Sequence, residues 1–379
     1  MTKVAVLGDG ITAQAVRSFL AHANDYQDSP IQTADWIVTS PGIPPAQWPA
    51  TSVEIISDIE FAIRVLHSRG VFPTIVGITG TNGKTTVTAG LAHALNQTAY
   101  GNIGRPLILD IDHCQASDPL IIELSSYQLV SSPSLHCDVA VILNIEPDHL
   151  AWHGTFEAYQ AAKFSIIKGD QRVYMPKKLH ESHQWPHPID FCAIDDLNCA
   201  ELDQFSGAHN QQNAAIIIDI ATYLGLDHSV MMQRLKTFNL PPFRCQKLTS
   251  RNGRIIVNDS KATNMSATIA AVQSFPGRKL LILAGQAKAP FSDAFMRLVF
   301  RECEVIYAAG DLAKNKAVFP KEWQSKLHFF DSVASATQSA LNEYPTGTIL
   351  FSPAAASFDE FENYVARGEA FSHYVKQHQ

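Results

Sequence analysis

The residues with the clearest chemical purpose lie at positions 80–86, in the sequence Gly-Thr-Asn-Gly-Lys-Thr-Thr. They follow an apolar run at 75–78, so the glycines stand where a buried strand turns into a helix. Glycines let backbone N–H groups face phosphate oxygens, a lysine neutralises the β- and γ-phosphate charge, and a hydroxyl can bind Mg²⁺. The segment predicts an ATP-phosphate loop, with Lys84 at the phosphates and Thr85 at the metal.

This loop departs from the general phosphate-loop pattern, which places glycine six residues before the lysine. That position is Ile78 here, and the glycine stands at Gly80 instead. The alternative is a glycine-rich turn that binds nothing. A lysine followed by two threonines would add nothing to such a turn, so we favour the phosphate loop.

Two further polar clusters follow apolar strands. Glu123 closes the run 120–122, and Asp148 and His149 follow the run 139–143. A carboxylate at a buried strand end is costly unless it is paired, and its natural partner here is the metal at the phosphates. Asp148 could instead cap the following helix. His149 and His153 have the i,i+4 spacing of a zinc pair, but no third ligand follows, so we interpret His153 as structural.

Lys163 lies on the apolar face predicted for a helix near 161–164. Considered alone it would be an ordinary lysine whose stem is buried and whose ammonium reaches solvent. Its spacing from His149 favours a functional role instead.

Composition bounds the class of protein. The 379 residues are 46% apolar and 17% charged, with a formal net charge of −7, which argues against sequence-independent binding to nucleic acid or anionic membranes. Six cysteines without C-x-x-C spacing, and the absence of a signal-like N-terminus, predict reduced thiols in a cytoplasmic protein. We expect small-molecule partners and a monomer.

Length and the order of the elements predict three α/β domains. Residues 1–72 form a Rossmann-like domain with strands at 4–7 and 36–39, residues 73–240 a doubly wound parallel sheet around the phosphate loop, and residues 241–379 a second Rossmann-like domain. Strands are expected in the last domain at 254–257, 279–284, 305–308 and 348–351. Pro241 and Pro242 predict a stiff hinge between the last two domains.

The first domain has only a weak dinucleotide-binding pattern. Gly8 and Gly10 open a helix, but residues 24–30 are polar, and we expect no strand there. This pattern could indicate NAD binding or a turn that faces a phosphate group. We prefer the phosphate-facing turn. Near the C-terminus, Ser357 and Glu360 have the spacing of a capping box at a helix start, where an anion can bind.

Taken in order, these motifs resemble the Mur ligase family along the whole chain. The motifs that carry the resemblance are Gly80–Thr86, Asn102-Ile103-Gly104, Glu123, Asp148-His149, Ala162-Lys163, His209-Asn210-Gln211-Gln212-Asn213-Ala214, Arg244, Asn258-Asp259-Ser260-Lys261-Ala262-Thr263-Asn264 and the segment 350–371. The last segment is similar to the branch of the family that adds D-glutamate, and the Asp-Asn-Pro-Arg signature of the diaminopimelate-adding branch is absent.

The resemblance implies an ATP-dependent ligase that joins D-glutamate to UDP-N-acetylmuramoyl-L-alanine through an acyl phosphate, in peptidoglycan precursor synthesis. It implies two Mg²⁺ sites, one at Thr85 and Glu123, and one at His149 and a Lys163 that carries CO₂ as a carbamate. Carbamylation makes chemical sense, because a bare ammonium would repel Mg²⁺. The alternatives are a folylpolyglutamate-synthase-like ligase and a P-loop ATPase that switches a partner.

By the same resemblance the remaining site residues fall into three groups. Residues that bind ATP are Gly80, Thr81, Asn82, Gly83, Lys84, Thr85, Thr86, Asn210, Arg244 and Asp259. Residues that bind the UDP-substrate are Ile11, Thr12, Ser40, Gly42, Asn102, Ser125 and Gln128. Residues that bind D-glutamate are Lys261, Thr263, Lys288, Ser357, Phe358 and Tyr364. The first domain is shorter than the family pattern, so we expect its turns to hold the diphosphate more than the uracil.

Overall fold

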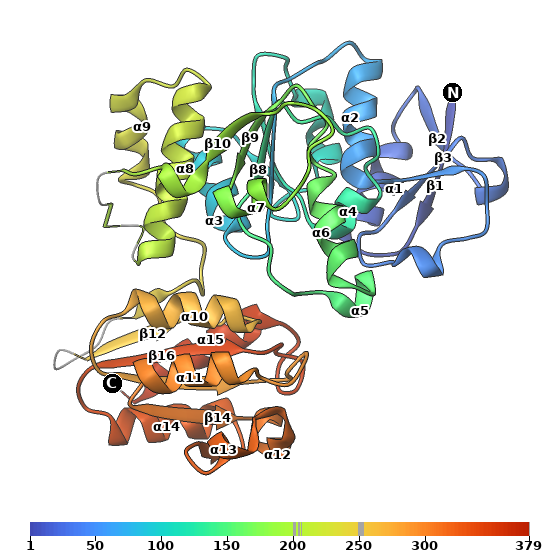
Figure 1. The fold of residues 1–379 in the computed structure, drawn as a ribbon. Helices are drawn as coiled ribbons and strands as arrows, with labels where there is room; N and C mark the ends of the chain where they lie inside the picture. Colours follow the sequence, from blue (N-terminus) through green and yellow to red (C-terminus); the bar gives the residue numbers. More distant parts are fainter. Residues whose placement is uncertain (200–201, 204, 206, 249–253, 379) are drawn as a thin grey trace. The chain divides into compact units, whose positions relative to one another are not determined.

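The computed structural model describes residues 1–378 apart from 200–201, 204, 206 and 249–253. The described residues form three sheets with flanking helices (Figure 1). They divide into two compact units, Met1–Ala200 with Gln212–Phe238, and Glu201–Gln211 with Asn239–Gln379. This confirms the predicted α/β fold class with its three sheets. No helix in the described part of the chain has the length and apolarity needed to cross a membrane.

The N-terminal sheet has the strand order β2-β1-β3-β4, and all its strands are parallel. Its elements are β1 (Thr2–Leu7), α1 (Ile11–Leu20), β2 (Tyr26–Asp28), β3 (Trp36–Thr39), β4 (Glu54–Ser57) and α2 (Asp58–Ser68). The expected strands at 4–7 and 36–39 are confirmed as parts of β1 and β3.

The expectation that residues 24–30 hold no strand is wrong, because β2 lies there and pairs with β1. A single side chain explains this short strand. Tyr26 is 4% exposed, its ring packs edge-on against Phe61 at 5.6 Å, and its hydroxyl lies 3.0 Å from that of Ser68. Three residues are too few to show the alternation that identifies a strand in sequence.

The central sheet has the order β10-β9-β8-β5-β7-β6 and is parallel throughout, as predicted. Its strands are β5 (Ile75–Thr79), β6 (Ala99–Gly101), β7 (Leu120–Glu123), β8 (Val139–Ile142), β9 (Arg172–Met175) and β10 (Asp190–Ala193). Its helices are α3 (Lys84–Leu95), α4 (Ser126–Val130), α5 (Leu150–His153), α6 (Phe156–Phe164), α7 (Lys177–Glu181), α8 (Ala208–Tyr223) and α9 (His228–Leu235). The strands that follow β5 in the chain lie on both of its sides, β6 and β7 on one side and β8, β9 and β10 on the other. The direction in which strands are added therefore reverses at β5, and sheets of this kind bind ligands at such a switch point.

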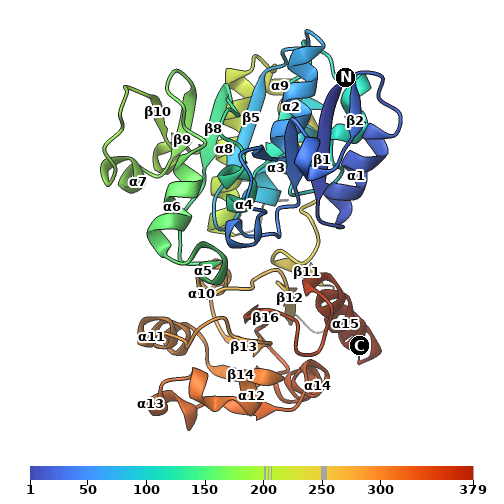
Figure 2. The ribbon, with the colours of Figure 1, turned by 90° about the vertical axis from the view of Figure 1, so that its right-hand side faces the viewer.

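One continuous cluster of buried apolar side chains joins the first two sheets within the first compact unit. Figure 2 shows the ribbons of these two sheets. The cluster runs from Val4 and Val16 through Phe61 of α2 to Ile122 of β7 and Ile142 of β8. The N-terminal sheet is therefore fixed against the sheet that carries the phosphate loop.

Gly77, in the middle of β5, gives a test of this packing. A Cβ added there would lie 2.5 Å from Cys137 Sγ and 3.0 Å from side-chain carbons of Ile166 and Leu124. We expect Gly77→Ala to lower the free energy of unfolding by about 1–3 kcal/mol through overpacking. Urea denaturation measures the change. Gly42→Ala, where no atom lies within 4 Å of the added Cβ, is the control, and equal stability of both variants would contradict the prediction.

The C-terminal sheet has the order β11-β12-β16-β13-β14-β15, parallel except for the edge strand β11. Its strands are β11 (Gln246–Leu248), β12 (Ile255–Asn258), β13 (Lys279–Ala284), β14 (Val305–Ala309), β15 (His328–Phe330) and β16 (Thr348–Ala354). Its helices are α10 (Met265–Ser274), α11 (Asp293–Glu302), α12 (Asp311–Lys314), α13 (Lys321–Gln324), α14 (Val333–Glu343) and α15 (Tyr364–Gln377). The four strands expected here are all present, within a few residues at their ends.

The predicted capping box at Ser357 is wrong. No helix begins there, since α15 starts at Tyr364 and is capped by Asn363, whose Oδ1 accepts hydrogen bonds from the two N–H groups of residues 365 and 366. The acidic residues of the predicted box serve other helices. Asp359 Oδ2 accepts from the N–H of Asp311 at the start of α12, and Glu360 accepts from the N–H at the start of α14. A sequence pattern cannot reveal which helix a capping carboxylate will reach.

Candidate active site

The phosphate loop has the strand–loop–helix setting that its chemistry requires. It connects β5 to α3, and its two glycines adopt positive φ angles, 148° at Gly80 and 86° at Gly83, where other residues would be strained. Lys84 begins the helix, and its Nζ donates to the carbonyl oxygens of Gly80 at 2.8 Å and Thr81 at 3.0 Å. The Lys84 side chain therefore lies over the loop that is predicted to bind the phosphates, whose negative charge it is predicted to neutralise.

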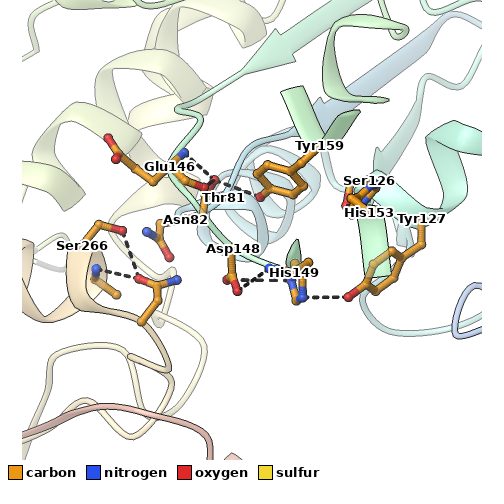
Figure 3. Close-up of polar contacts among 12 residues, drawn as sticks. Thr81, Asn82, Ser126, Tyr127, Glu146, Asp148, His149, His153, Tyr159 and Ser266 are labelled. Atoms are coloured by element: carbon orange, nitrogen blue, oxygen red, sulfur yellow. Dashed lines mark hydrogen bonds and ion pairs between the residues drawn. The ribbon is translucent and has the colours of Figure 1, made fainter. Parts of the chain in front are cut away.

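Residues that follow β8 brace this loop. The side-chain oxygen of Asn144 accepts from the N–H groups of Thr81 at 3.1 Å and Asn82 at 2.8 Å, and its amide donates to the Asn82 carbonyl at 3.1 Å. The Thr81 hydroxyl lies 2.9 Å from the Tyr159 hydroxyl and accepts from the Glu146 N–H at 2.9 Å (Figure 3). Sequence reasoning did not assign Asn144 a role, although its place at a strand end was a usable signal.

Glu123 has the features of a metal ligand. It ends β7, is 1% exposed, and its Oε1 accepts from Asn102 Nδ2 at 2.8 Å. Its Oε2 is buried with no hydrogen-bond partner among the described residues, which leaves one carboxylate oxygen for a cation. Thr85, half-buried at the start of α3, offers a hydroxyl. The donor set therefore fits Mg²⁺, which prefers oxygen ligands.

Lys163 is not the solvent-reaching lysine that its sequence alone suggested. It is 1% exposed on α6, and its Nζ donates to the Gly80 carbonyl at 2.8 Å and lies 4.7 Å from the centre of the Tyr159 ring. Burial, reinforced by the positive charge of Lys84, holds the pKa of Lys163 well below that of an ordinary lysine, although Asp148 and Glu123 oppose this shift. A buried amine with a depressed pKa is a competent nucleophile.

His149 is held by two polar neighbours. Its Nδ1 lies 2.6 Å from the Tyr127 hydroxyl and its Nε2 lies 3.8 Å from Asp148 Oδ2 (Figure 3). Asp148 does not cap the helix that follows, because α5 has no side-chain cap; its Oδ1 accepts from the His149 N–H at 2.8 Å instead. Nearby, His153 Nε2 lies 2.9 Å from the Ser126 hydroxyl, and burial lowers the pKa of His153 to about 4. His153 thus has the structural contacts expected of it.

The described residues contain no group of three or more histidines, cysteines, aspartates or glutamates that could hold a metal. A cation at this site would therefore depend on one carboxylate, a hydroxyl, phosphate oxygens and any derivative of Lys163. That requirement is compatible with the carbamate predicted for Lys163.

The N-terminal turns place polar groups at the carboxyl ends of β1 and β3. Ser40 follows β3, and its buried hydroxyl has no hydrogen-bond partner among the described residues. It lies beside the Gly8 turn, where a Cβ would approach its oxygen to 2.5 Å. Ile11, 77% exposed, and the half-buried Thr12 begin α1, and Gly42 is exposed. An unpartnered buried hydroxyl near a helix start is suited to a phosphate oxygen.

Two residues predicted to contact the UDP-substrate have structural roles. Ser125 and Gln128 form a reciprocal capping box at the start of α4. Gln128 is 1% exposed, and its Nε2 donates to Asp58 Oδ1 on α2 at 3.3 Å. Burial raises the pKa of Asp58 to about 6, although that hydrogen bond opposes the shift. The Gln128 amide therefore links α4 of the central sheet to α2 of the N-terminal sheet.

The three ATP-contact residues predicted beyond the loop belong to the second compact unit. Asn210 is buried in α8, and half-buried Arg244 donates to the Pro242 carbonyl at 3.1 Å. Asp259 accepts from the Cys245 N–H at 3.0 Å and from the Ser352 hydroxyl at 2.7 Å, and burial raises the pKa of Asp259 to about 7.

Another asparagine approaches the phosphate loop directly. Asn213 belongs to the first compact unit, and its Oδ1 would lie 3.2 Å from a Cβ added at Gly83. Its sequence position, three residues after Asn210 on the same helix, was the available signal.

Five of the six predicted D-glutamate residues lie on loops at the carboxyl ends of the C-terminal strands, and Tyr364 begins α15. Lys261 Nζ is 4.2 Å from the centre of the Tyr364 ring, and Ser357 is buried after β16. Thr263 is half-buried, Lys288 is exposed, and Phe358 is 70% exposed.

Arg367, which sequence reasoning did not assign, joins these loops. Its side chain is fully buried and donates to the carbonyl oxygens of Ser260 at 2.8 Å, Ala284 at 3.1 Å and Ala355 at 3.0 Å. These carbonyls lie at the ends of β12, β13 and β16. Arg367 therefore fixes the loops that carry Lys261, Lys288 and Ser357 relative to one another.

Comparison with known proteins identifies the family. Residues 78–175 match the Mur ligase middle domain. A UDP-N-acetylmuramoylalanine--D-glutamate ligase of Sphingopyxis alaskensis is 36% identical over 362 residues, covering 88% of this chain and 82% of that protein. One of Zymomonas mobilis is 33% identical over 376 residues, covering 89% and 82%. The chain belongs to the Mur ligase family.

Several solved structures have the same fold as this Mur ligase. The MurF ligase of Thermotoga maritima in complex with ADP superposes with a TM-score of 0.63 at 16% identity, covering all of this chain and 96% of that one. The UDP-N-acetylmuramate-alanine ligase MurC of Thermotoga maritima gives 0.58 at 15% identity, covering both chains in full. A folylpolyglutamate synthase of Mycobacterium tuberculosis gives 0.59 at 14% identity, covering 84% and 94%.

Proposed function

We propose that this Mur ligase joins D-glutamate to UDP-N-acetylmuramoyl-L-alanine with consumption of ATP, in cytoplasmic peptidoglycan precursor synthesis. The observation that carries the proposal is the 36% identity, over 88% of the chain, to a ligase named for that reaction. The phosphate loop, with Glu123 and Lys163 buried beside it, supplies a site for the chemistry.

The first step transfers the γ-phosphoryl group of ATP to the alanyl carboxylate, which gives ADP and an acyl phosphate. Backbone N–H groups of the loop and Lys84 Nζ bind the phosphate oxygens and stabilise their developing charge. Thr85 and Glu123 would hold one Mg²⁺, which supplies further neutralisation of phosphate charge when bound. The amine of D-glutamate then attacks the acyl carbon and displaces phosphate.

Lys163 would act after reaction with CO₂. Its neutral amine attacks the carbon of CO₂, an N–C bond forms and the nitrogen loses a proton, leaving a carbamate. This converts the buried amine into a carboxylate-like group that can hold a second Mg²⁺, with His149 beside it. The depressed pKa of Lys163 supports the proposal, because only the uncharged amine reacts.

Recognition of the two substrates would use different loops. The Ser40 hydroxyl and the turns at Gly10 and Gly42 would bind the diphosphate of the UDP-substrate. Lys261, Thr263, Lys288 and Ser357 would bind D-glutamate, with Tyr364 and Phe358 beside it. These donors exceed what one α-carboxylate needs, so they favour an acceptor with a second carboxylate.

The test is phosphate release with UDP-N-acetylmuramoyl-L-alanine and a panel of amino acids. We expect D-glutamate to support turnover, and D-glutamine to cost about 2–4 kcal/mol, or about one to three decades in kcat/KM, because its side chain lacks the second carboxylate that the cationic donors would bind. L-Glutamate should fail because its amine is misdirected from the acyl carbon. Equal rates with D-glutamine or L-glutamate would contradict the proposal, and phosphate release that needs no amino acid would indicate an ATPase instead.

A further inference from the structure

Two strained residues flank Arg244 in the segment that leads into β11. Phe243 and Cys245 both have backbone angles in the left-handed region, with φ of 62° and 49°. Residues with a bulky side chain rarely adopt this conformation, and they keep it only where the surrounding structure enforces it. Strain of this kind gathers at active sites and ligand-binding sites. The contacts that enforce it around Arg244 therefore point to a function for the segment.

The first of the two, Phe243, is held against helix α15. It is 7% exposed, and a Cβ added at Gly368 would lie between 2.4 and 2.8 Å from three carbons of its ring. Only a glycine at this position of α15 allows the ring to come so close. The Phe243 N–H donates to Gln246 Oε1 at 3.2 Å, and its carbonyl oxygen accepts from the Lys261 N–H at 3.1 Å. The ring and both backbone groups of Phe243 therefore have fixed partners.

The second, Cys245, is held by Asp259, which directly follows β12. The Cys245 N–H donates to Asp259 Oδ1 at 3.0 Å, and Asp259 Oδ2 accepts from the Ser352 hydroxyl at 2.7 Å. Cys245 is 4% exposed, and its Sγ lies 4.0 Å from His209 Nε2. All these partners belong to the second compact unit. The backbone is thus fixed on both sides of the half-buried Arg244.

Resting on the ligase function proposed above and on the ATP contact that the family resemblance implies for Arg244, we propose that Phe243 is a positioning residue for Arg244. Left-handed residues turn the chain on both sides of the arginine, and the contacts with Gly368 and Asp259 prevent the turn from relaxing. A guanidinium carried on a fixed backbone loses less conformational freedom when it binds phosphate oxygens. Phe243 acts through Arg244 and makes no contact with substrate itself.

Backbone mobility at Arg244 tests the proposal without turnover. In ¹⁵N-arginine-labelled enzyme free of nucleotide, the Arg244 amide signal is assigned by its loss in Arg244→Lys. We expect an order parameter of about 0.85 in the wild type and below about 0.6 in Phe243→Ala. Gly368→Ala, which displaces the ring without deleting it, should give the same loss of order. A mobile amide in the wild type, or a rigid one in either folded variant, would overturn the proposal.

Kinetics test whether the fixed backbone serves the nucleotide. We expect Phe243→Ala to lower kcat/KM for ATP about tenfold and to leave the KM for D-glutamate within about twofold, because it affects an ATP contact and not the acceptor residues. In an Arg244→Ala background the same substitution should have no further effect. An equal loss in that background would show that Phe243 acts by packing alone and would refute the proposal.

Phe319→Ala is the matched control. Phe319 lies in the same compact unit, is 2% exposed, and packs against Phe291 with ring centroids 5.2 Å apart. Its truncation also leaves a cavity in the core, but the Arg244 order parameter and kcat/KM for ATP should stay unchanged. If the NMR results hold but neither the wild type nor any variant releases phosphate with D-glutamate, the proposed function fails while the fixing of Arg244 by Phe243 stands.

Discussion

The Lys84→Ala enzyme is expected to release no phosphate above background. Lys84 Nζ lies on the phosphate loop, within 3.0 Å of the carbonyl oxygens of Gly80 and Thr81. Without it, charge that develops on the γ-phosphoryl group is uncompensated, which costs several kcal/mol, or about a thousandfold or more in kcat. Phosphate release with both substrates at saturation measures the loss.

Two measurements make this result specific to the loop. Lys178→Ala, which removes an exposed lysine on α7, should retain full activity. Circular dichroism and thermal unfolding should show that Lys84→Ala is folded. Near-wild-type turnover in a folded Lys84→Ala enzyme would disprove the assignment of the phosphate loop.

Loss of Lys163 should be as severe but reversible by small molecules. Lys163→Ala removes the amine proposed to carry CO₂ and leaves a buried space beside Gly80 and Tyr159. We expect kcat to fall by about a thousandfold, the scale of losing one charged group that stabilises the transition state. Added acetate or propionate, which can place a carboxylate in that space, should restore part of the activity.

The carbamate itself can be observed. Enzyme equilibrated with ¹³C-bicarbonate and Mg²⁺ should show a carbamate carbon signal that disappears in Lys163→Ala. Lys279→Ala is the control, because Lys279 is also a buried lysine, 3% exposed, but donates to the Phe275 carbonyl at 2.7 Å in the C-terminal sheet. Absence of the signal in wild-type enzyme, or its persistence in Lys163→Ala, would count against carbamylation.

Sequence predicted the parts of this protein that depend on short stretches of chain. The loop at Gly80–Thr86 and the apolar strands around it are encoded by neighbouring residues, so the fold class, the central parallel sheet and the strand end at Glu123 were accessible. The short β2 was missed because one aromatic side chain, Tyr26, anchors it through contacts distant in sequence. Local pattern carries no information about such contacts.

The support around the site depends on tertiary structure, and sequence did not reveal it. Asn144 braces the phosphate loop, yet it lies more than sixty residues further along the chain. The carboxylates of Asp359 and Glu360 were predicted to belong to their own helix but cap two others. Burial of Lys163 could not be read from an amphipathic segment, since the same pattern suits a lysine that reaches solvent.

The buried Arg367 has a consequence for how the acceptor could be changed. Its guanidinium bonds only to backbone carbonyls and the Ser260 hydroxyl among the contacts the structure shows, and backbone carbonyls are present whatever the side chain. Arg367 therefore holds the starts of the three loops after β12, β13 and β16, whichever side chains the rest of each loop carries. Exchanging Phe358 or Lys288 should alter which amino acid is preferred while the frame beneath them persists, so this domain is a suitable scaffold for selecting ligases with new acceptors.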